Sequence, residues 1–367
     1  MQIDSIELDG YRNFSGVKCA FDPAVNVITG QNAQGKTNLL ESVYLLAAGH
    51  SFRAKTDREL IGFDADSAYI KAQIVSDGRE QTIEALLRPG RSKSFTVNGA
   101  KQKSFAQMAG RLTAVLFSPG DLAIIREGSS ARRRLLDGCI SQLRPRYAAA
   151  LASFNRAYAQ KTRILRDWHE KPDLLDALDD YSDQLARCSA ELIYYRAHFV
   201  RRLSELAGEI HREFSGGSET LTADYITVKT VTDPTRPPAE LYPQLLEHWQ
   251  SHRAAEIESG LCLSGAHKDD LFIRINGLEA KSYASQGQTR TAALSLKLGE
   301  REMIRREKGE YPVLLLDDVL SELDSQRQSF VLNRIAGGQV FITCCEEAGI
   351  SEKTGGHILQ VEHGRIR

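Results

Sequence analysis

Residues 30–37 read Gly30-Gln31-Asn32-Ala33-Gln34-Gly35-Lys36-Thr37 and fill every fixed position of the phosphate-binding loop, or P-loop, pattern. Its glycines let the backbone turn so that successive N–H groups point inward at a phosphate. In this pattern the lysine reaches the β- and γ-phosphates of a nucleotide, and the threonine hydroxyl coordinates Mg²⁺. We therefore take all of these residues as nucleotide-binding candidates, with Lys36 as a catalytic candidate and Thr37 as a metal ligand.

The flanking sequence supplies the strand and the helix that a P-loop joins. Val25 to Thr29 is a short strand-like run, and the apolar residues that follow Lys36 recur at spacings of three and four, as in an amphipathic helix. Three later apolar runs, at 313–316, 339–343 and 358–361, show no alternation with polar residues. Such runs suit strands that are buried on both faces of a parallel sheet. The sequence therefore predicts an α/β fold.

A pair of acidic residues supplies the second half of the candidate site. Asp317 and Asp318 directly follow the apolar run Val313 to Leu316. In P-loop folds a carboxylate at the end of a buried strand lies beside the loop, so Asp317 is the expected Mg²⁺ partner. Asp318 is then placed to orient or deprotonate the attacking water, which makes both acids catalytic candidates. The alternative is that the pair only marks the point where a strand reaches the surface.

The middle of the chain predicts long helices. From Leu174 to Phe214 the apolar positions alternate steps of four and three, a heptad pattern with one slip at Leu203. A helix from Pro172 and Asp173 to Phe214 would be roughly 60 Å long at about 1.5 Å per residue. An earlier helix, with apolar residues on one face between Tyr147 and Trp168, could pack antiparallel against it as a short arm. Two long helices in an ordinary helical lobe would give the same pattern.

Composition places the chain among folded proteins. Hydrophobic residues make up 42% and charged residues 26% of its 367 residues, unlike the composition of disordered chains. That length allows two lobes, since domains commonly have ~100 to 200 residues. No apolar run approaches the ~20 residues that would span a bilayer, and the first residues do not resemble a signal peptide. We therefore expect a cytoplasmic protein that does not engage a membrane.

Charge is unevenly distributed, although the formal net charge is only −1. Between Arg91 and Glu170 there are 15 Lys and Arg residues against 5 Asp and Glu residues. A local basic excess favours binding to a nucleic-acid backbone, because such association releases counterions. A solvated helical face is the alternative, and charge alone does not separate the two.

One tetrapeptide suggests a function only because of its position in the chain. Ser285-Gln286-Gly287-Gln288 opens a predicted helix that runs to about Glu307, shortly before the acidic pair. By itself such a sequence is a polar helix cap. In ABC-type ATPases, however, a serine-glycine-glutamine signature occupies this place.

Taken together, these features resemble the RecF family of the SMC/Rad50-like ABC ATPases over nearly the full chain. The segments that carry the resemblance, besides the P-loop and the acidic pair, are Tyr11 to Phe14, Phe117 to Leu122, Arg132 to Asp137, Gly265 to Asp270, Ser285 to Arg290 and Ser321 to Asp324. The resemblance implies an ABC-type P-loop ATPase head made from residues 1–119 and 285–367. Residues 120–284 would form a mainly helical second lobe with an antiparallel coiled-coil-like arm.

The resemblance also implies a function. A family member would bind ATP and Mg²⁺, hydrolyse ATP weakly and form an ATP-dependent homodimer. Ser285, Gln286, Gly287 and Gln288 would then bind the γ-phosphate held by the opposite subunit, and Ser321 to Asp324 would contact that subunit. Such a protein would bind double-stranded and gapped DNA in recombinational repair, replication restart and the SOS response. It would work with RecR and RecO to help load the RecA recombinase.

Two features depart from what such ATPases usually contain. Asp318 stands where a glutamate is usual, and its shorter side chain predicts slow hydrolysis. Thr343-Cys344-Cys345 follows the next strand, where transporter subunits carry a switch histidine, so Thr343 is only a candidate for sensing the γ-phosphate. His267 lies in one of the family-like segments and is more readily explained as a structural histidine than as a catalytic one.

The candidate DNA contacts are basic residues in the first half of the chain. They are Arg53, Lys55, Lys101, Lys103, Arg132, Arg133 and Arg134. For the arginine triplet a structural or partner-binding role is an equal alternative.

Three other functions compete with a DNA-binding ATPase. The chain could be an ATP-gated scaffold that recruits partners and uses hydrolysis only to reset. It could be the ATPase subunit of a transporter, which the heptad pattern and the missing switch histidine disfavour. A metabolic kinase is a weaker alternative, because the Ser285 and Ser321 segments would then have no role.

Overall fold

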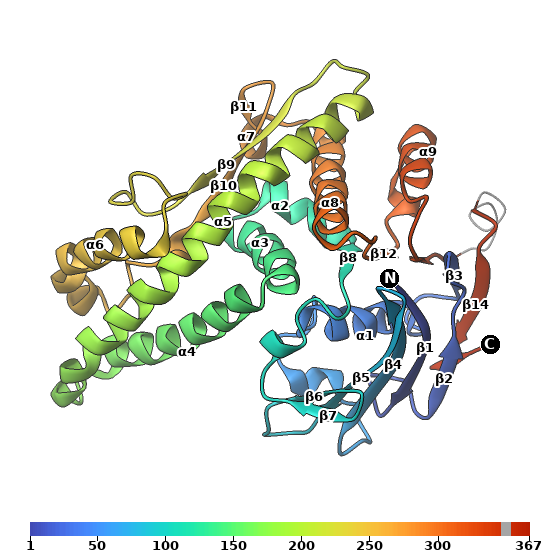
Figure 1. The fold of residues 1–367 in the computed structure, drawn as a ribbon, viewed down its shortest axis with the longest axis horizontal. Helices are drawn as coiled ribbons and strands as arrows, with labels where there is room; N and C mark the ends of the chain where they lie inside the picture. Colours follow the sequence, from blue (N-terminus) through green and yellow to red (C-terminus); the bar gives the residue numbers. More distant parts are fainter. Residues whose placement is uncertain (346–353) are drawn as a thin grey trace. The chain divides into compact units, whose positions relative to one another are not determined.

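The computed structural model describes residues 1–345 and 354–367, and the structural statements below refer to these residues. The chain divides into two compact units (Figure 1). Unit 1 comprises residues 1–121, 213–216 and 294–367, and unit 2 comprises residues 122–212 and 217–293.

Unit 1 contains a six-stranded antiparallel sheet near the start of the chain. Its order is β2-β1-β4-β5-β6-β7. The strands are β1 (Gln2–Asp9), β2 (Val17–Ala20), β4 (Ala68–Ser76), β5 (Arg79–Leu87), β6 (Ser94–Val97) and β7 (Ala100–Gln102). Strand β4 and residues 5–9 of β1 alternate buried side chains with partly or fully exposed ones, so this sheet buries one face in the core.

A second sheet of unit 1 carries the strands that the sequence analysis predicted. Its order is β15-β14-β3-β13-β12-β8, and the neighbours from β14 to β8 are parallel. The strands are β3 (Val25–Thr29), β8 (Ala114–Phe117), β12 (Val313–Asp317), β13 (Val340–Thr343), β14 (His357–Glu362) and β15 (Arg365–Ile366). Every residue of β12 and β13 is buried, which confirms for these two strands the prediction of burial on both faces, and β8 is buried as well. For residues 358–361 the prediction was wrong, because β14 alternates exposed and buried side chains and so has one exposed face.

Helix α1 (Lys36–Ala48) lies between the two sheets of unit 1 and contacts β5 on one side and β8, β12 and β13 on the other. Its apolar residues join one continuous core with both sheets. Two further helices belong wholly or partly to this unit, α8 (Gln286–Lys308) and α9 (Ser325–Arg334). Helix α8 begins in unit 2 and continues into unit 1 from Leu294.

Unit 2 is mainly helical, as predicted. Its longer helices are α3 (Ser129–Leu143), α4 (Pro145–Asp167), α5 (Leu178–Phe214, whose last residues fall in unit 1) and α6 (Pro238–Ser259). A three-stranded sheet of order β11-β10-β9 accompanies them, formed by β9 (Leu221–Ile226), β10 (Asp270–Ile275) and β11 (Leu278–Glu279).

Short helical turns connect these elements. They are α2 (Ala123–Arg126), α7 (Ala280–Tyr283), η1 (Asp57–Leu60), η2 (Phe105–Gln107), η3 (Pro119–Leu122), η4 (Pro172–Ala177), η5 (Ala266–Lys268) and η6 (Leu320–Glu322).

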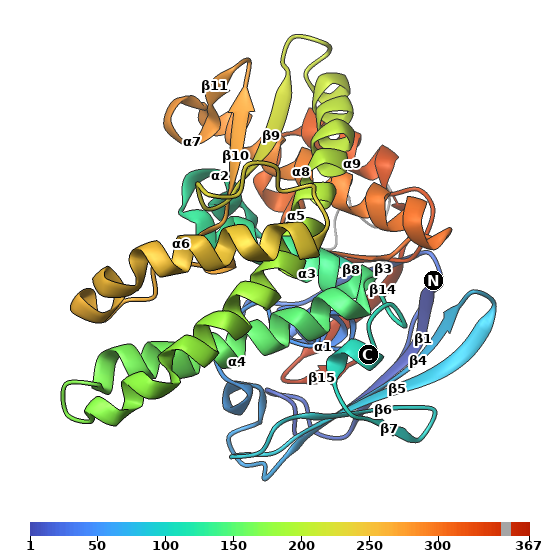
Figure 2. The same cartoon turned by 60° about the vertical axis from the view of Figure 1, so that its left-hand side comes forward.

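The predicted antiparallel arm is present, and a third helix accompanies it (Figures 1 and 2). Helices α4 and α5 are joined by residues 168–177, and Tyr147 near the start of α4 contacts Arg196 at the middle of α5. Helix α6 is tied to α4 by the buried ion pair between Lys161 and Glu256, whose charged atoms are 2.7 Å apart. The long helix starts at Leu178 rather than at Pro172, because residues 172–177 form a 3₁₀ turn. None of the described helices is both long and apolar enough to cross a bilayer.

Two of the family-like segments meet in the core of unit 2. The guanidinium of Arg196, which is 2% exposed, donates to the carboxylates of Asp137 and Asp269 and to the carbonyl oxygen of Ala266. Asp137 belongs to the 132–137 segment, and the other two acceptors belong to the 265–270 segment. A buried charge is tolerated when it is paired and hydrogen-bonded in this way. The two segments therefore join α3, α5 and the start of β10.

His267 is a partly buried side chain of this same region. Its Nε2 lies 3.0 Å from the carbonyl oxygen of Cys262, and its ring packs against Phe154 and Tyr158. Burial lowers the pKa of His267 to about 4. This environment supports the structural interpretation of the residue.

Replacing His267 by Gln should flatten the pH dependence of stability in mild acid. The unfolded chain binds a proton at its ordinary histidine pKa, whereas the folded chain does not until about pH 4. The free energy of unfolding of the wild type should therefore be highest above the pKa that His267 has in the unfolded chain. It should fall by on the order of 2 to 3 kcal/mol as the pH drops toward the pKa that His267 has in the folded chain. Chemical denaturation at several pH values measures this loss.

The control for this experiment is His169→Gln, since His169 is exposed in the same unit. The control should follow the wild-type profile between these pH values, while His267→Gln should lose less stability. Identical profiles for the wild type and His267→Gln would show that the lowered pKa of His267 is not the cause of the loss of stability in acid.

Candidate nucleotide-binding site

The P-loop adopts a conformation that its glycines make possible. Gly30 and Gly35 have φ values of 144° and 119°. A Cβ atom at Gly30 would lie 2.3 Å from the carbonyl oxygen of Val361, and one at Gly35 would lie 2.7 Å from the side-chain nitrogen of Asn13. Neither position has space for a side chain, so glycine is required at both by its neighbours, the backbone of Val361 at Gly30 and the Asn13 side chain at Gly35.

Lys36 is held against its own loop. Its ammonium group donates to the carbonyl oxygens of Gly30 and Gln31, and the side chain is largely buried. The same ammonium group lies 3.8 Å from the thiol sulfur of Cys345. A buried cation whose hydrogen bonds end on loop carbonyls is placed to meet a phosphate that enters the loop.

Thr37 and Asp317 meet across 280 residues of sequence. The Thr37 hydroxyl donates to Oδ1 of Asp317 at 2.8 Å. This contact arises because β12 ends at the same edge of the parallel sheet as β3, which leads into the P-loop. Hydroxyl and carboxylate oxygens are the ligands that Mg²⁺ prefers, so the pair fits the predicted metal.

The pKa of Asp317 reflects its position at this edge. Burial raises the pKa, and hydrogen bonds from Thr37 and Thr343 lower it without cancelling the effect of burial. Arg53 also lowers the pKa and neighbouring Asp318 raises it. A nearby cation would stabilise the charged carboxylate further.

Asp318 takes a backbone conformation that is uncommon for a residue with a side chain. Its φ is 54°, in the left-handed region. Its N–H donates to the Thr343 hydroxyl at 2.9 Å, and its carboxylate accepts a hydrogen bond from the Ser321 hydroxyl at 2.9 Å. The two acids therefore have different partners, although they are adjacent in sequence.

Glu41 is a site-supporting residue that the sequence analysis missed. It is fully buried on α1 and accepts hydrogen bonds from Arg12, Ser51 and Arg53. Burial raises the pKa of Glu41, but these hydrogen bonds more than offset it, so the net pKa is lowered. An acidic residue within the apolar stripe of the predicted helix was the signal that could have revealed it.

Asn13 links the Tyr11 to Phe14 segment to the P-loop. Its side-chain amide donates to the carbonyl oxygen of Gln34 at 2.8 Å, and its side-chain oxygen accepts from Asn38 at 2.7 Å. The N–H of His363, near the end of the chain, donates to the Gln34 side chain at 2.6 Å. The loop is thus supported by residues from both ends of the chain.

The Ser285 segment forms a preorganised helix start in unit 2. The Ser285 hydroxyl accepts from the Gln288 N–H at 3.2 Å, and the Gln288 side chain accepts from the Ser285 N–H at 2.9 Å. This reciprocal arrangement is a capping box. Ser285 and Gln286 are exposed at the end of the 23-residue helix α8, where an anion is stabilised. The predicted contact with the nucleotide of a second subunit stays a prediction.

The predicted DNA contacts fall into two groups. Lys55, Lys101, Lys103 and Arg134 are exposed and stay candidates. Arg53 donates to Asn38 and Glu41, close to the nucleotide site. For Arg132 the structure favours the structural alternative, because its buried guanidinium donates to the Asp270 carboxylate and to the carbonyl oxygens of Ile124 and Glu127.

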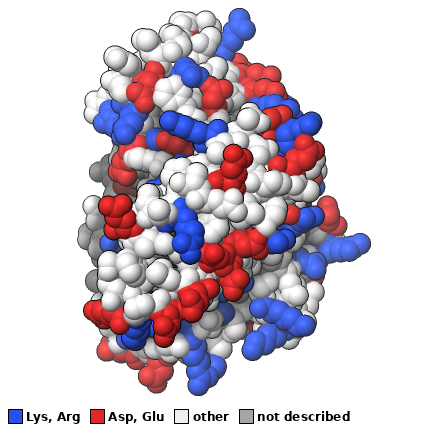
Figure 3. All heavy atoms as spheres, turned by 90° about the vertical axis from the view of Figure 1, so that its left-hand side faces the viewer, with Lys and Arg blue, Asp and Glu red and all other residues white. Residues whose placement is uncertain are grey.

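The remaining member of the triplet, Arg133, donates to the carbonyl oxygen of Asp269 at 2.7 Å. The face shown in Figure 3 carries Lys and Arg side chains interspersed with Asp and Glu rather than one uniformly basic surface. DNA contacts on this face would therefore involve individual basic side chains among acidic ones.

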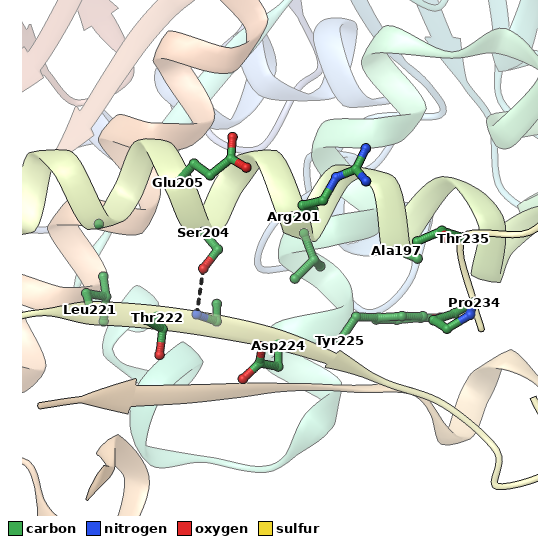
Figure 4. Close-up of a pocket in the computed structure, with 13 residues that line it drawn as sticks. Ala197, Arg201, Ser204, Glu205, Leu221, Thr222, Asp224, Tyr225, Pro234 and Thr235 are labelled. Atoms are coloured by element: carbon green, nitrogen blue, oxygen red, sulfur yellow. Dashed lines mark hydrogen bonds between the residues drawn. The ribbon is translucent and has the colours of Figure 1, made fainter. Parts of the chain in front are cut away.

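A cavity of about 580 Å³ lies elsewhere, between α5 and β9 of unit 2 (Figure 4). Residues of α5 and β9 line it, and the Ser204 hydroxyl of α5 accepts a hydrogen bond from the Ala223 N–H of β9 at 2.8 Å. Its lining contains none of the predicted site residues. The P-loop stays the predicted nucleotide site, because a triphosphate is recognised by inward N–H groups, a lysine and a metal-binding hydroxyl rather than by the volume of a cavity.

Replacing Glu41 by Gln should weaken nucleotide binding and destabilise the protein. The change leaves Arg12 and Arg53 without their shared buried carboxylate, and breaking a buried ion pair typically costs about 3 to 5 kcal/mol. Affinity for a fluorescent ATP analogue should fall several-fold, and the free energy of unfolding should fall as well. Glu80→Gln, at an exposed position of β5, is the control and should change neither quantity. Wild-type affinity and stability in Glu41→Gln would contradict this role.

Sequence comparisons agree with this geometry. Residues 2–364 match the family described as the RecF/RecN/SMC N terminal domain. A protein of Acetivibrio thermocellus named DNA replication and repair protein RecF is 38% identical, covering 100% of this chain and 99% of its own. The Bacillus subtilis protein of the same name is 38% identical, covering 96% of each chain.

Solved structures give the same result. The recombination mediator protein RecF, in a structure described as RecF-ATP in the RecFOR pathway, is 34% identical, with a TM-score of 0.89 over 100% of this chain and 96% of that chain. The Smc head domain of Pyrococcus furiosus has a TM-score of 0.54 at 16% identity, covering 100% of this chain and 95% of that chain, and shows that the fold is shared. The sequence and the structure together establish that the chain belongs to the RecF family of DNA replication and repair proteins, which has the ABC-type ATPase fold.

Proposed function

We propose that the protein binds ATP at the P-loop, dimerises when ATP is bound, and acts on DNA in recombinational repair. The observation that carries the proposal is the Thr37–Asp317 hydrogen bond beside a P-loop whose lysine is already directed at the loop. The relatives described as RecF-ATP support the choice of nucleotide. Inward N–H groups, Lys36 and the hydroxyl–carboxylate pair are the groups that a Mg²⁺-bound triphosphate needs.

Dimerisation is proposed from the exposed start of α8. The start of α8 presents N–H groups and the Ser285 hydroxyl, so it can bind an anion. In the proposed dimer, that end would meet the γ-phosphate held by the P-loop of the other copy. Binding of ATP would then stabilise the dimer, because a ligand stabilises the state to which it binds more tightly.

Hydrolysis in this scheme is slow and depends on Mg²⁺. Asp318 would orient or deprotonate the attacking water, and bound Mg²⁺ would neutralise charge on the phosphates. Two features support a low rate: the aspartate is one methylene shorter than a glutamate, and its carboxylate is held by Ser321. Loss of the γ-phosphate would remove the bridge between the copies.

The partners follow from the family. Relatives are named for DNA replication and repair, and one structure is described within the RecFOR pathway. We propose that the protein binds double-stranded and gapped DNA in the cytoplasm and cooperates with RecR and RecO to help load RecA. Exposed Lys55, Lys101, Lys103 and Arg134 are the proposed phosphate contacts.

An ATP-gated scaffold is the second candidate, favoured by the Ser321–Asp318 hydrogen bond, which occupies the proposed base. Asp318→Asn separates the two functions. If the protein is a scaffold, the variant should still bind its partners when ATP is bound. If the protein needs ATP turnover, the variant should no longer load RecA in a RecA-loading assay.

Lys36→Arg should abolish ATP-dependent dimerisation. The larger planar guanidinium cannot reproduce the short contacts that Lys36 makes inside the loop. Light scattering should show a dimer for the wild type with ATP, and a monomer with ADP or without nucleotide. The exposed Lys18→Arg should behave as the wild type. A wild-type protein that stays monomeric with ATP would refute the proposal.

DNA binding should depend on both salt and ATP. If phosphate contacts dominate, the logarithm of the affinity should fall linearly with the logarithm of salt concentration and vary little with sequence. Replacing Lys101 and Lys103 together by Gln should reduce this slope by about one to two if both contact phosphates. Titrations with labelled duplex DNA at several salt concentrations measure this slope. An affinity that changes with neither salt nor ATP would contradict the proposed ATP-dependent binding to DNA phosphates.

A further inference from the structure

The Thr343 side chain connects the two acids of the proposed site. It is 2% exposed at the end of β13. Its hydroxyl lies 3.0 Å from Oδ1 of Asp317 and accepts from the Asp318 N–H at 2.9 Å. The carbonyl oxygen of Leu316 is farther away, at 3.4 Å. A hydroxyl has one proton to donate, and the nearer, charged oxygen of Asp317 is the stronger acceptor.

Strand pairing fixes this contact. Strands β12 and β13 are parallel neighbours, and Asp317 is paired with Thr343 in their register. On its other side β13 pairs with β3, the strand that enters the P-loop. Thr343 therefore occupies the strand between the two halves of the site.

The hydrogen bonds constrain Asp317 and Asp318 differently. Oδ1 of Asp317 accepts from both Thr37 and Thr343, which fixes the rotation of the carboxylate. Among the described residues, no hydrogen bond reaches its Oδ2 atom. At Asp318 the backbone has a φ of 54°, and the N–H bond to Thr343 supports this costly conformation.

We infer that Thr343 is a positioning residue that sets the geometry of both acids, Asp317 toward Mg²⁺ and Asp318 toward the attacking water. This inference rests on the proposed function of the two acids. It replaces the interpretation of Thr343 as a γ-phosphate sensor, because its proton and an acceptor lone pair are already engaged. The hydroxyl is the required group, so serine should substitute for it and valine should not.

The test compares Thr343→Val, which keeps the shape of the side chain, with Thr343→Ser, which keeps the hydroxyl. Affinity for a fluorescent ATP analogue is measured with Mg²⁺ and with EDTA. For Thr343→Val, the gain in affinity on adding Mg²⁺ should shrink at least tenfold relative to the wild type. Its affinity in EDTA should stay within about twofold, since one hydrogen-bond difference remote from the phosphates changes little. Thr343→Ser should keep most of the Mg²⁺ effect.

A matched control separates this role from a general effect on the sheet. Thr113 is 1% exposed just before β8 of the same sheet, and its hydroxyl contacts the sulfur of Met1. Thr113→Val should leave the Mg²⁺ effect unchanged. Steady-state kinetics in Mg²⁺ should also show that Thr343→Val lowers kcat and raises KM for ATP, whereas Thr113→Val changes neither.

The outcomes distinguish failure of the inference from failure of the proposed function. A wild-type protein that does not bind ATP refutes the proposed function. A wild type with a Mg²⁺ effect that Thr343→Val retains refutes the role of Thr343. If Thr343→Val does not fold, amide hydrogen exchange of the wild type decides: a protected Asp318 N–H supports the inference, and rapid exchange overturns it.

Discussion

The hydrogen bond between Thr37 and Asp317 depends on one constraint, the parallel alignment of β3, β13 and β12. Parallel strands end at the same edge of a sheet, so residues far apart in sequence meet there. The P-loop extends from the first of these strands, Thr343 ends the second, and the acidic pair ends the third. If the register of β12 shifted by one residue, the side chains of Asp317 and Asp318 would exchange faces and the site would be lost.

Buried charges fix the local structure within each unit. In unit 1, Glu41 of the P-loop helix accepts hydrogen bonds from two arginines. In unit 2, Arg196 donates hydrogen bonds to two aspartates. Such groups contribute little net stability compared with apolar side chains of similar size, but removing one partner is costly. Their main effect here is to position the chain, because each holds together several segments that are distant in sequence.

The residues proposed to meet a nucleotide are divided between the units. The P-loop and the acids belong to unit 1, and the Ser285 helix start belongs to unit 2. Each set is already ordered by its own hydrogen bonds, as the capping box and the Thr37 contact show. Preorganised groups lose little conformational entropy on binding, so a triphosphate between two copies would be recognised with little rearrangement.

The sequence alone determined the P-loop, the strands that flank it, the acidic pair and the long helices. These features are local, since glycine positions and apolar periodicity are imposed by backbone and burial. Only the tertiary structure decided the roles of Glu41, Thr343 and Arg132, because each depends on a partner distant in sequence. A buried carboxylate, a bridging hydroxyl and a paired arginine resemble ordinary polar residues in a sequence until folding brings their hydrogen-bond partners to them.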